Sequence, residues 1–181
     1  MSKKIIKSPV DPEVLLPLRF LVLDIDGVMT DGSITYTSSG EEMKTFNVKD
    51  GSGLKYWARA GYQAGIITGR SSAMVERRAE ELDIAFVIMG AKHKTPAFEQ
   101  MLEQAGVKPE EAVMIGDDLP DLPLINRVGF GVAVADAVQE VKEAADHITK
   151  KKGGRGAVRE TIEFILKRQG RWDGIMERYL Q

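Results

Sequence analysis

The sequence contains no cysteine and no apolar segment long enough to cross a membrane. The absence of cysteine excludes disulfides, zinc–thiolate sites and thiol catalysis, so a bound metal must have oxygen ligands. The segment 1–18 is interrupted by Pro9, Pro12 and Pro17 and lacks the apolar run of a signal peptide. We therefore expect a cytoplasmic protein without a membrane partner.

The chain also has little net charge, with 25 Lys and Arg against 27 Asp and Glu in 181 residues. Such a balance provides no basic field for nucleic acid, so we expect no nucleic-acid partner. A hydrophobic content of 43% suits one compact domain over residues 1–181. The two histidines, His93 and His147, are expected at the surface because no second motif histidine accompanies either.

A short apolar run, Phe20–Leu23, ends in two carboxylates, Asp24 and Asp26. This pattern predicts a strand buried on both faces of a parallel sheet, and ligands of open α/β sheets bind at the carboxyl ends of such strands. Adjacent carboxylates resist joint ionisation, so the pair predicts a divalent metal or a division into nucleophile and proton donor. For this pair alone, two solvated acids in a turn remain an alternative.

Residues 33–46 contain two alternating β-prone runs around Ser38-Ser39-Gly40. The pattern predicts a β-hairpin that projects near the site. An isolated hairpin is marginally stable in water, so we expect this one to find a partner.

Strands and helices alternate along the rest of the chain, which predicts a doubly wound, mainly parallel, Rossmann-like α/β sheet. We expect Ser71 or Ser72 to cap one helix, and Thr95 and Pro96 to begin another. Residues 150–156 are expected to form a flexible basic loop before the closing helices of the segment 150–181. The expected strands are 63–68, 84–89, 112–116, 129–134 and 147–149, and the expected helices include 50–60, 97–105, 137–145, 157–168 and 172–179.

Polar side chains follow four of the predicted strands and should meet at one edge of the sheet. Any one of these groups is a weak signal, but four together predict a site. They are Asp24 with Asp26, Thr68 with Arg70, Lys94, and Asp117 with Asp118 and Asp121.

These residues form an ordered set of motifs: Asp-x-Asp-Gly-Val-x-Thr from Asp24, a strand ending in Thr68-Gly69, a single Lys94, and Gly-Asp-Asp-x-x-Asp from Gly116. The set resembles the four motifs of the haloacid dehalogenase superfamily of phosphatases over residues 19–160. The resemblance implies that Asp24 attacks phosphorus to form an aspartyl-phosphate, and that Asp26 is the general acid and base.

The resemblance also implies a Mg²⁺ ion held by Asp24, the carbonyl group of Asp26 and Asp117. Thr68 and the Gly69 amide would bind phosphoryl oxygens, and Lys94 would neutralise charge on Asp24 and the phosphoryl group. Asp118 and Asp121 would orient metal-bound waters or Lys94, and capping of the next helix remains an alternative for both.

A closer resemblance, to the 3-deoxy-D-manno-octulosonate 8-phosphate phosphatases, rests on the segments 24–32, 46–53, 67–70, 116–123 and 152–160. It implies a homotetramer without a cap domain that acts on a sugar-acid phosphate in lipopolysaccharide precursor biosynthesis, with hairpins that cover neighbouring sites. Arg70 would bind the substrate carboxylate, whereas relatives acting on a nine-carbon ketoacid phosphate tend to carry Glu there. Arg78 would provide a second guanidinium, or be a solvated helix residue, and Arg155 would be a lid residue, or part of a disordered linker.

Three alternatives remain at this stage. One is a phosphatase of the nine-carbon ketoacid phosphate. A phosphoacceptor signalling domain is another, although its acceptor Asp would end the third strand, which here ends in Met89-Gly90. The last is a catalytically silent oligomerisation or sugar-binding module, which would not need the proton donor Asp26.

Overall fold

The computed structural model describes residues 10 and 12–180. Its centre is a six-stranded sheet in the order β5-β4-β1-β6-β7-β8, in which every pairing is parallel. This arrangement confirms the predicted doubly wound α/β fold. The strands are β1 (Phe20–Leu23), β4 (Gln63–Ile67), β5 (Phe86–Ile88), β6 (Ala112–Gly116), β7 (Phe130–Ala133) and β8 (His147–Ile148).

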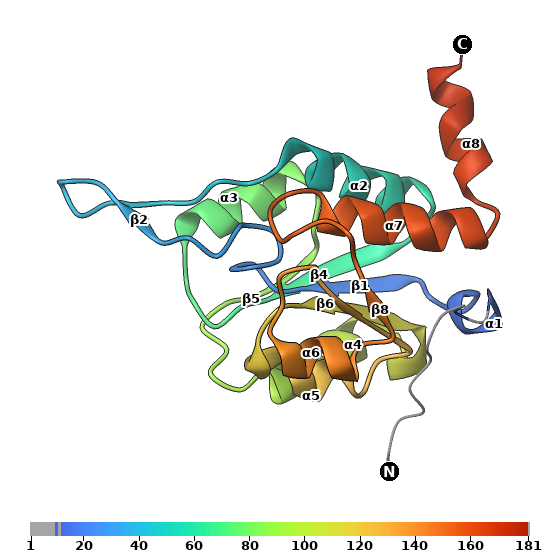
Figure 1. Cartoon of the computed structure of the whole chain (residues 1–181). Helices are drawn as coiled ribbons and strands as arrows, with labels where there is room; N and C mark the ends of the chain where they lie inside the picture. The colour runs from blue at the N-terminus through green and yellow to red at the C-terminus, as the bar shows by residue number, and fades with distance from the viewer. Residues whose placement is uncertain (1–9, 11, 181) are drawn as a thin grey trace.

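Strand β1 lies in the middle of the sheet, and all four of its side chains are fully buried. It is apolar throughout because helices cover both faces of the sheet (Figure 1). One face carries α2 (Val48–Arg59), α3 (Ala73–Glu81) and α7 (Ala157–Arg168), and the other carries α4 (Lys94–Ala105), α5 (Leu122–Ile125) and α6 (Gln139–Ala144).

The predicted hairpin is present as β2 (Thr35–Tyr36) and β3 (Glu42–Met43), an antiparallel pair that projects from the body of the molecule (Figure 1). Three of its large apolar side chains, Ile34, Tyr36 and Met43, are more than half exposed. The hairpin therefore presents apolar surface that residues 10 and 12–180 leave uncovered.

Shorter elements complete the described part of the chain: α1 (Pro12–Leu15), η1 (Pro109–Glu111), η2 (Leu119–Asp121), α8 (Trp172–Met176) and η3 (Glu177–Tyr179). Among residues 10 and 12–180, none of the helices has the length and apolar character that a bilayer crossing requires. Most of the segment on which the signal-peptide expectation rests, residues 1–9 and 11, lies outside the described residues.

The predicted start of α4 differs from the structure, whereas α3 begins after Ser72, one of the two predicted caps. Helix α4 begins at Lys94, so Thr95 and Pro96 lie inside its first turn and His93 is the N-cap. Proline fits anywhere in a first turn because the N–H groups there have no intrahelical acceptor, so it marks the turn rather than the residue. Ser72 is the N-cap of α3, but its hydroxyl makes no capping hydrogen bond.

The expectation that His147 lies at the surface is wrong. Its ring is half-buried and stacks on Phe164 at 4.5 Å and on Phe130 at 6.2 Å between ring centroids. His93, in contrast, is exposed as expected.

The glycine-rich segment 150–156 is packed against the protein, which corrects the expectation of a flexible loop. The Gly154 N–H donates to the Val28 carbonyl at 2.8 Å, and the Gly153 N–H donates to Asp136 at 3.0 Å. A β-carbon at Gly153 would lie 1.7 Å from the Gly27 carbonyl oxygen. Glycine is therefore required here by close backbone contact with the loop that follows β1.

Candidate active site

The carboxyl ends of the central strands meet at one edge of the sheet and surround a pocket of about 280 Å³. Nine of the predicted site residues line it, and Arg78 and Arg155 do not. The lining residues are Asp24, Asp26, Thr68, Gly69, Arg70, Ala91, Lys92, Lys94, Asp117, Asp118, Pro120 and Asp121.

Asp24 is the first residue after β1, and its N–H still donates to the Ile115 carbonyl of β6, at 3.4 Å. The chain then turns sharply at Gly27, whose φ of +94° is readily adopted only by glycine. A β-carbon at Gly27 would lie 2.0 Å from Oδ2 of Asp117. The glycine therefore makes the turn and also allows the Asp117 carboxyl group to approach the loop.

Lys94 is the first residue of α4, and its ammonium group joins two carboxylates. Its Nζ lies 2.8 Å from Oδ1 of Asp24 and 2.7 Å from Oδ1 of Asp121, and the side chain is 5% exposed. Burial opposes the charged form of Lys94, but attraction to Asp24 and Asp121 outweighs this and raises its pKa. Lys94 is therefore a fixed positive charge in the pocket.

The carboxylates of Asp24, Asp117 and Asp121 each place an oxygen within 4.8 Å of the other two. Burial, and then repulsion from Asp121 and Asp24, raises the pKa of Asp117 to about 8. Burial and repulsion from Asp121 also raise the pKa of Asp24 to about 6, despite the opposing effect of Lys94. Oδ1 of Asp117 is buried without a hydrogen-bond partner among the described residues.

One ammonium group does not balance three converging carboxylates. A hard divalent cation with oxygen ligands would supply the missing charge and a partner for the buried oxygen of Asp117. The donor set therefore fits Mg²⁺.

Asp121 and Asp118 have different environments. Asp121 is almost fully buried and accepts from the N–H of Asp117 at 2.9 Å in addition to binding Lys94. Asp118 is exposed and caps η2 by accepting from the Leu119 N–H at 2.8 Å. The capping alternative describes Asp118 and also part of Asp121, which accepts from the Asp118 N–H at 3.4 Å in the capping box of η2 while its other oxygen binds Lys94.

Thr68 and Gly69 lie at the end of β4, on the opposite side of β1 from β6. Thr68 is buried, and its hydroxyl accepts from the Arg70 N–H at 3.4 Å. A β-carbon at Gly69 would meet only the Ala91 carbonyl, at 3.9 Å, so the backbone here is open to a ligand.

Arg78 and Arg155 are occupied elsewhere in the chain. Arg78 pairs with Glu81 at 3.0 Å, and its guanidinium lies 5.9 Å from the centre of the Phe46 ring. Arg155 is exposed and pairs with Asp31 at 3.0 Å. The described structure does not bring either guanidinium into the pocket of its own chain.

Comparison with known proteins identifies relatives of this chain. A family model of haloacid dehalogenase-like hydrolases matches residues 86–162. The 3-deoxy-D-manno-octulosonate 8-phosphate phosphatase KdsC of Salmonella typhimurium is 42% identical over 169 residues, which cover 92% of this chain and 90% of that protein. The chain belongs to the KdsC phosphatase family. KdsC of Haemophilus influenzae is 41% identical and covers 85% of this chain.

Solved structures of KdsC phosphatases have the same fold as this chain. The phosphatase of Moraxella catarrhalis, in complex with a magnesium ion, a phosphate ion and KDO, is 40% identical with a TM-score of 0.90 and covers 93% of this chain and 97% of its own. The phosphatase of Yersinia pestis is also 40% identical, with a TM-score of 0.88, and covers 90% of this chain and 88% of its own. The predicted family and fold are confirmed.

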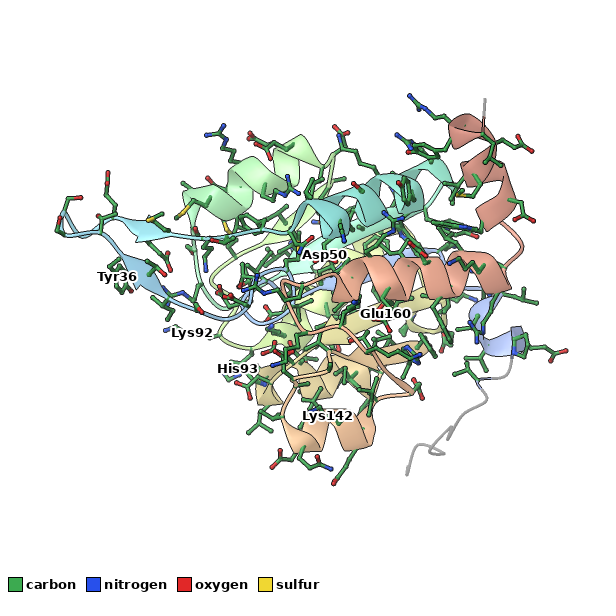
Figure 2. The ribbon with its side chains drawn as sticks, turned by 45° about the horizontal axis from the view of Figure 1, so that its top comes forward. Tyr36, Asp50, Lys92, His93, Lys142 and Glu160 are labelled. Atoms are coloured by element: carbon green, nitrogen blue, oxygen red, sulfur yellow. The ribbon has the colours of Figure 1, made fainter. Side chains whose placement is uncertain are left out.

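Sequence reasoning missed three charged residues of this KdsC phosphatase site. Lys92 is exposed and lines the pocket from the loop before α4 (Figure 2). Lys44 forms an ion pair with Asp26, and Glu42 binds Arg70 at 2.7 Å. The available signal was the alternation that runs through β3 to the next residue, which places Glu42 and Lys44 on the same side of the chain.

Proposed function

We propose that this chain is a Mg²⁺-dependent phosphatase that hydrolyses 3-deoxy-D-manno-octulosonate 8-phosphate to the free sugar acid and phosphate. The observation that carries the proposal is the pairing of Lys94 with Asp24 beside Asp117, in a pocket that Asp26 also lines. Family membership gives the substrate, and the carboxylate cluster gives the fit to the metal.

In the first step, a carboxylate oxygen of Asp24 attacks phosphorus, and the bond from phosphorus to the sugar oxygen breaks. Asp26 donates a proton to the departing alkoxide, which leaves as the free sugar acid. In the second step, Asp26 accepts a proton from water, the water oxygen attacks the aspartyl-phosphate, and inorganic phosphate leaves. Asp24 then returns to its carboxylate form.

The other pocket residues support these steps electrostatically. Lys94 holds Asp24 in place and offsets negative charge on the phosphoryl group, and Thr68 and the Gly69 amide bind phosphoryl oxygens. Mg²⁺ bound by Asp24, Asp117 and the Asp26 carbonyl would bring further positive charge to the phosphate.

We assign recognition of the sugar acid to cationic side chains other than Lys94. Arg70 and Lys92 line it in the same chain and suit a carboxylate. Arg78 and Arg155 do not line the pocket of their own chain, so we assign them to recognition from a neighbouring subunit. Arg70 also favours this substrate over the nine-carbon ketoacid phosphate, whose phosphatases tend to carry Glu there.

The proposal extends to assembly and location. We propose that the chain is one domain over residues 1–181, forms a homotetramer through the hairpin, and acts in the cytoplasm on a precursor of lipopolysaccharide. Exposed Ile34, Tyr36 and Met43 support association through the hairpin, because large apolar side chains gathered on a small projecting element favour burial.

The test measures phosphate release by the purified protein from the eight-carbon sugar-acid 8-phosphate and from the nine-carbon ketoacid 9-phosphate, with Mg²⁺ or with a chelator. We expect preference for the eight-carbon substrate, loss of activity with the chelator, and no turnover by Asp24→Asn, which keeps the size and shape of the side chain. Preference for the nine-carbon substrate would contradict the assigned substrate. Absence of hydrolysis of any phosphate ester would instead support a catalytically silent module.

A further inference from the structure

Lys44 follows directly after β3 and brings a buried positive charge to the pocket acid Asp26. Its side chain is 2% exposed, although the hairpin projects into solvent. The Lys44 ammonium forms an ion pair with Oδ1 of Asp26 and lies 3.8 Å from Oε1 of Glu42. Because a buried ammonium group is costly without a partner, the pair with Asp26 is what allows Lys44 to lie there.

The two oxygens of Asp26 have different cationic neighbours. Oδ1 contacts Lys44, and Oδ2 lies 3.8 Å from Nε of Arg70, beyond hydrogen-bond distance. Oδ2 is therefore the oxygen that is available to a substrate. The side chain of Asp26 is 23% exposed, so a ligand in the pocket can reach it.

Glu42 connects the two cations and completes a group of four charges. It binds Arg70 at 2.7 Å and lies 3.8 Å from Lys44. Two members, Glu42 and Lys44, come from the hairpin, while Asp26 and Arg70 come from the loops after β1 and β4. The four formal charges sum to zero, and each group restrains the orientation of its neighbours.

This network shows that the hairpin reaches the pocket of its own chain. Met43 is 55% exposed on the other side of β3, whereas Glu42 and Lys44 lie on the side that faces Asp26 and Arg70. If the hairpin served only to contact another subunit, Lys44 would not need to be buried against Asp26. The position of Lys44 therefore points to a role in the reaction.

We propose that Lys44 is a positioning residue for Asp26. Its ammonium group holds Oδ1 and so fixes the rotation of the carboxyl group, which turns Oδ2 toward the leaving oxygen of the substrate. Proton transfer requires approach to within hydrogen-bond distance, so a freely rotating Asp26 transfers its proton less efficiently. The inference rests on the proposed function, in which Asp26 is the general acid and base.

The experiment compares esters that differ in their need for a proton. The leaving group of an alkyl phosphate is a strongly basic alkoxide, whereas the leaving group of p-nitrophenyl phosphate is a stable phenolate. We expect Lys44→Met to lower kcat for glycerol phosphate and for the sugar-acid phosphate by about 10- to 100-fold. This loss is a part of the rate enhancement of about 10²- to 10⁴-fold that general acid catalysis typically provides. We expect a much smaller loss with p-nitrophenyl phosphate, and KM should change little with either ester.

Three further variants separate positioning from a structural effect. Lys44→Arg keeps the positive charge and should recover most of the activity on alkyl esters. Lys49→Met removes an exposed lysine near the hairpin and should behave like the unmodified enzyme. In the double variant of Lys44→Met with Asp26→Asn, activity should equal that of Asp26→Asn alone, because a positioning residue has no effect once its target is lost.

The outcomes decide between the alternatives. Equal losses on aryl and alkyl esters, or additive losses in the double variant, would overturn the positioning role. Unchanged kinetics in Lys44→Met would show that Lys44 only anchors the hairpin. Hydrolysis of the generic esters without hydrolysis of the sugar-acid phosphate would contradict the proposed substrate, while the comparison at Lys44 would still stand.

Discussion

Asp50, near the start of α2, accepts a hydrogen bond from the backbone N–H of Arg159 at 2.9 Å, in the first turn of α7. It also accepts from the Gly156 N–H at 3.1 Å, and its side chain is buried. Figure 2 shows Asp50 where α2 lies beside α7. One carboxylate from a neighbouring helix thus caps the start of α7 and holds the end of the glycine-rich loop.

We therefore expect Asp50→Ala to destabilise the protein by about 1–3 kcal/mol, because it removes the acceptor of one buried and one partly buried N–H group. The loop 150–156 packs on the backbone after β1, so phosphatase activity should fall as well. Urea unfolding followed by circular dichroism measures the first effect, with Asp173→Ala at an exposed position as the control. Equal midpoints for the two variants would contradict this account of Asp50.

Removal of the metal should change stability as well as activity. A cation that binds only the folded protein stabilises it by about 2.7 kcal/mol at 100 times its dissociation constant, and here it would also relieve repulsion among Asp24, Asp117 and Asp121. We expect Mg²⁺ to raise the unfolding temperature, and Asp117→Asn to reduce that rise sharply. Thermal unfolding with Mg²⁺ or a chelator checks this, with Asp173→Asn as the control. An equal rise in both variants would place the metal elsewhere.

Calcium provides a separate test of the same site. Ca²⁺ is larger than Mg²⁺ and takes more oxygen ligands, so it should hold Asp24 in a geometry unsuited to attack on phosphorus. We expect Ca²⁺ to suppress turnover in the presence of Mg²⁺, measured as phosphate release at increasing Ca²⁺ concentration. A rate of phosphate release that does not fall as Ca²⁺ is added would contradict the proposed metal site.

The half-buried ring of His147 makes stability depend on pH. Burial lowers its pKa below 6.5, against an opposing attraction from Glu160 and with some repulsion from Arg168. Above about pH 6.5 the imidazole is neutral in both states, so its contribution to stability is complete there. Below that pH the unfolded chain binds the proton first, and stability falls until the pH passes the lower pKa of the folded state.

We expect His147→Phe, which keeps an aromatic ring between Phe130 and Phe164, to weaken this loss of stability on acidification. The measurement is the urea midpoint as a function of pH, and exposed His93→Gln is the control. An unchanged pH dependence in His147→Phe would show that other groups account for the loss.

The sequence predicted the sheet and its edge well because both follow from local patterns. Continuous apolar runs such as Phe20–Leu23 identify buried parallel strands, and the chain order then places Asp24, Thr68, Lys94 and Asp117 at one edge. Each of these residues lies within a few positions of a strand end, so no distant contact had to be known.

The residues that were missed depend on distant contacts or on shape. Lys44 binds Asp26 across 18 positions, and Asp50 caps α7 across more than 100 positions. Composition suggested mobility for Gly153, whereas its actual constraint is a close backbone contact. A sequence pattern does not distinguish a glycine that provides flexibility from one that provides space.

The apolar surface of the hairpin is expected to hold subunits together. Ile34 and Met43 are 53% and 55% exposed, and a two-stranded hairpin has no core in which to bury them. We therefore expect the double variant Ile34→Ser and Met43→Ser to remain folded but to form smaller species than the proposed tetramer. Tyr36 is left unchanged because it lies beside Arg70 and helps to raise the pKa of that pocket residue. Leu16→Ser, which alters a 59% exposed apolar residue outside the hairpin, is the matched control.

Light scattering gives the mass, and two substrates show what the assembly contributes. The sugar-acid phosphate would contact Arg78 or Arg155 of a neighbouring subunit, whereas p-nitrophenyl phosphate needs only the pocket of one chain. Activity on the sugar-acid phosphate should therefore fall more than activity on the aryl ester. A monomer with full activity on both substrates would contradict the proposed assembly. A tetramer that persists in the double variant would show that another surface holds the subunits together.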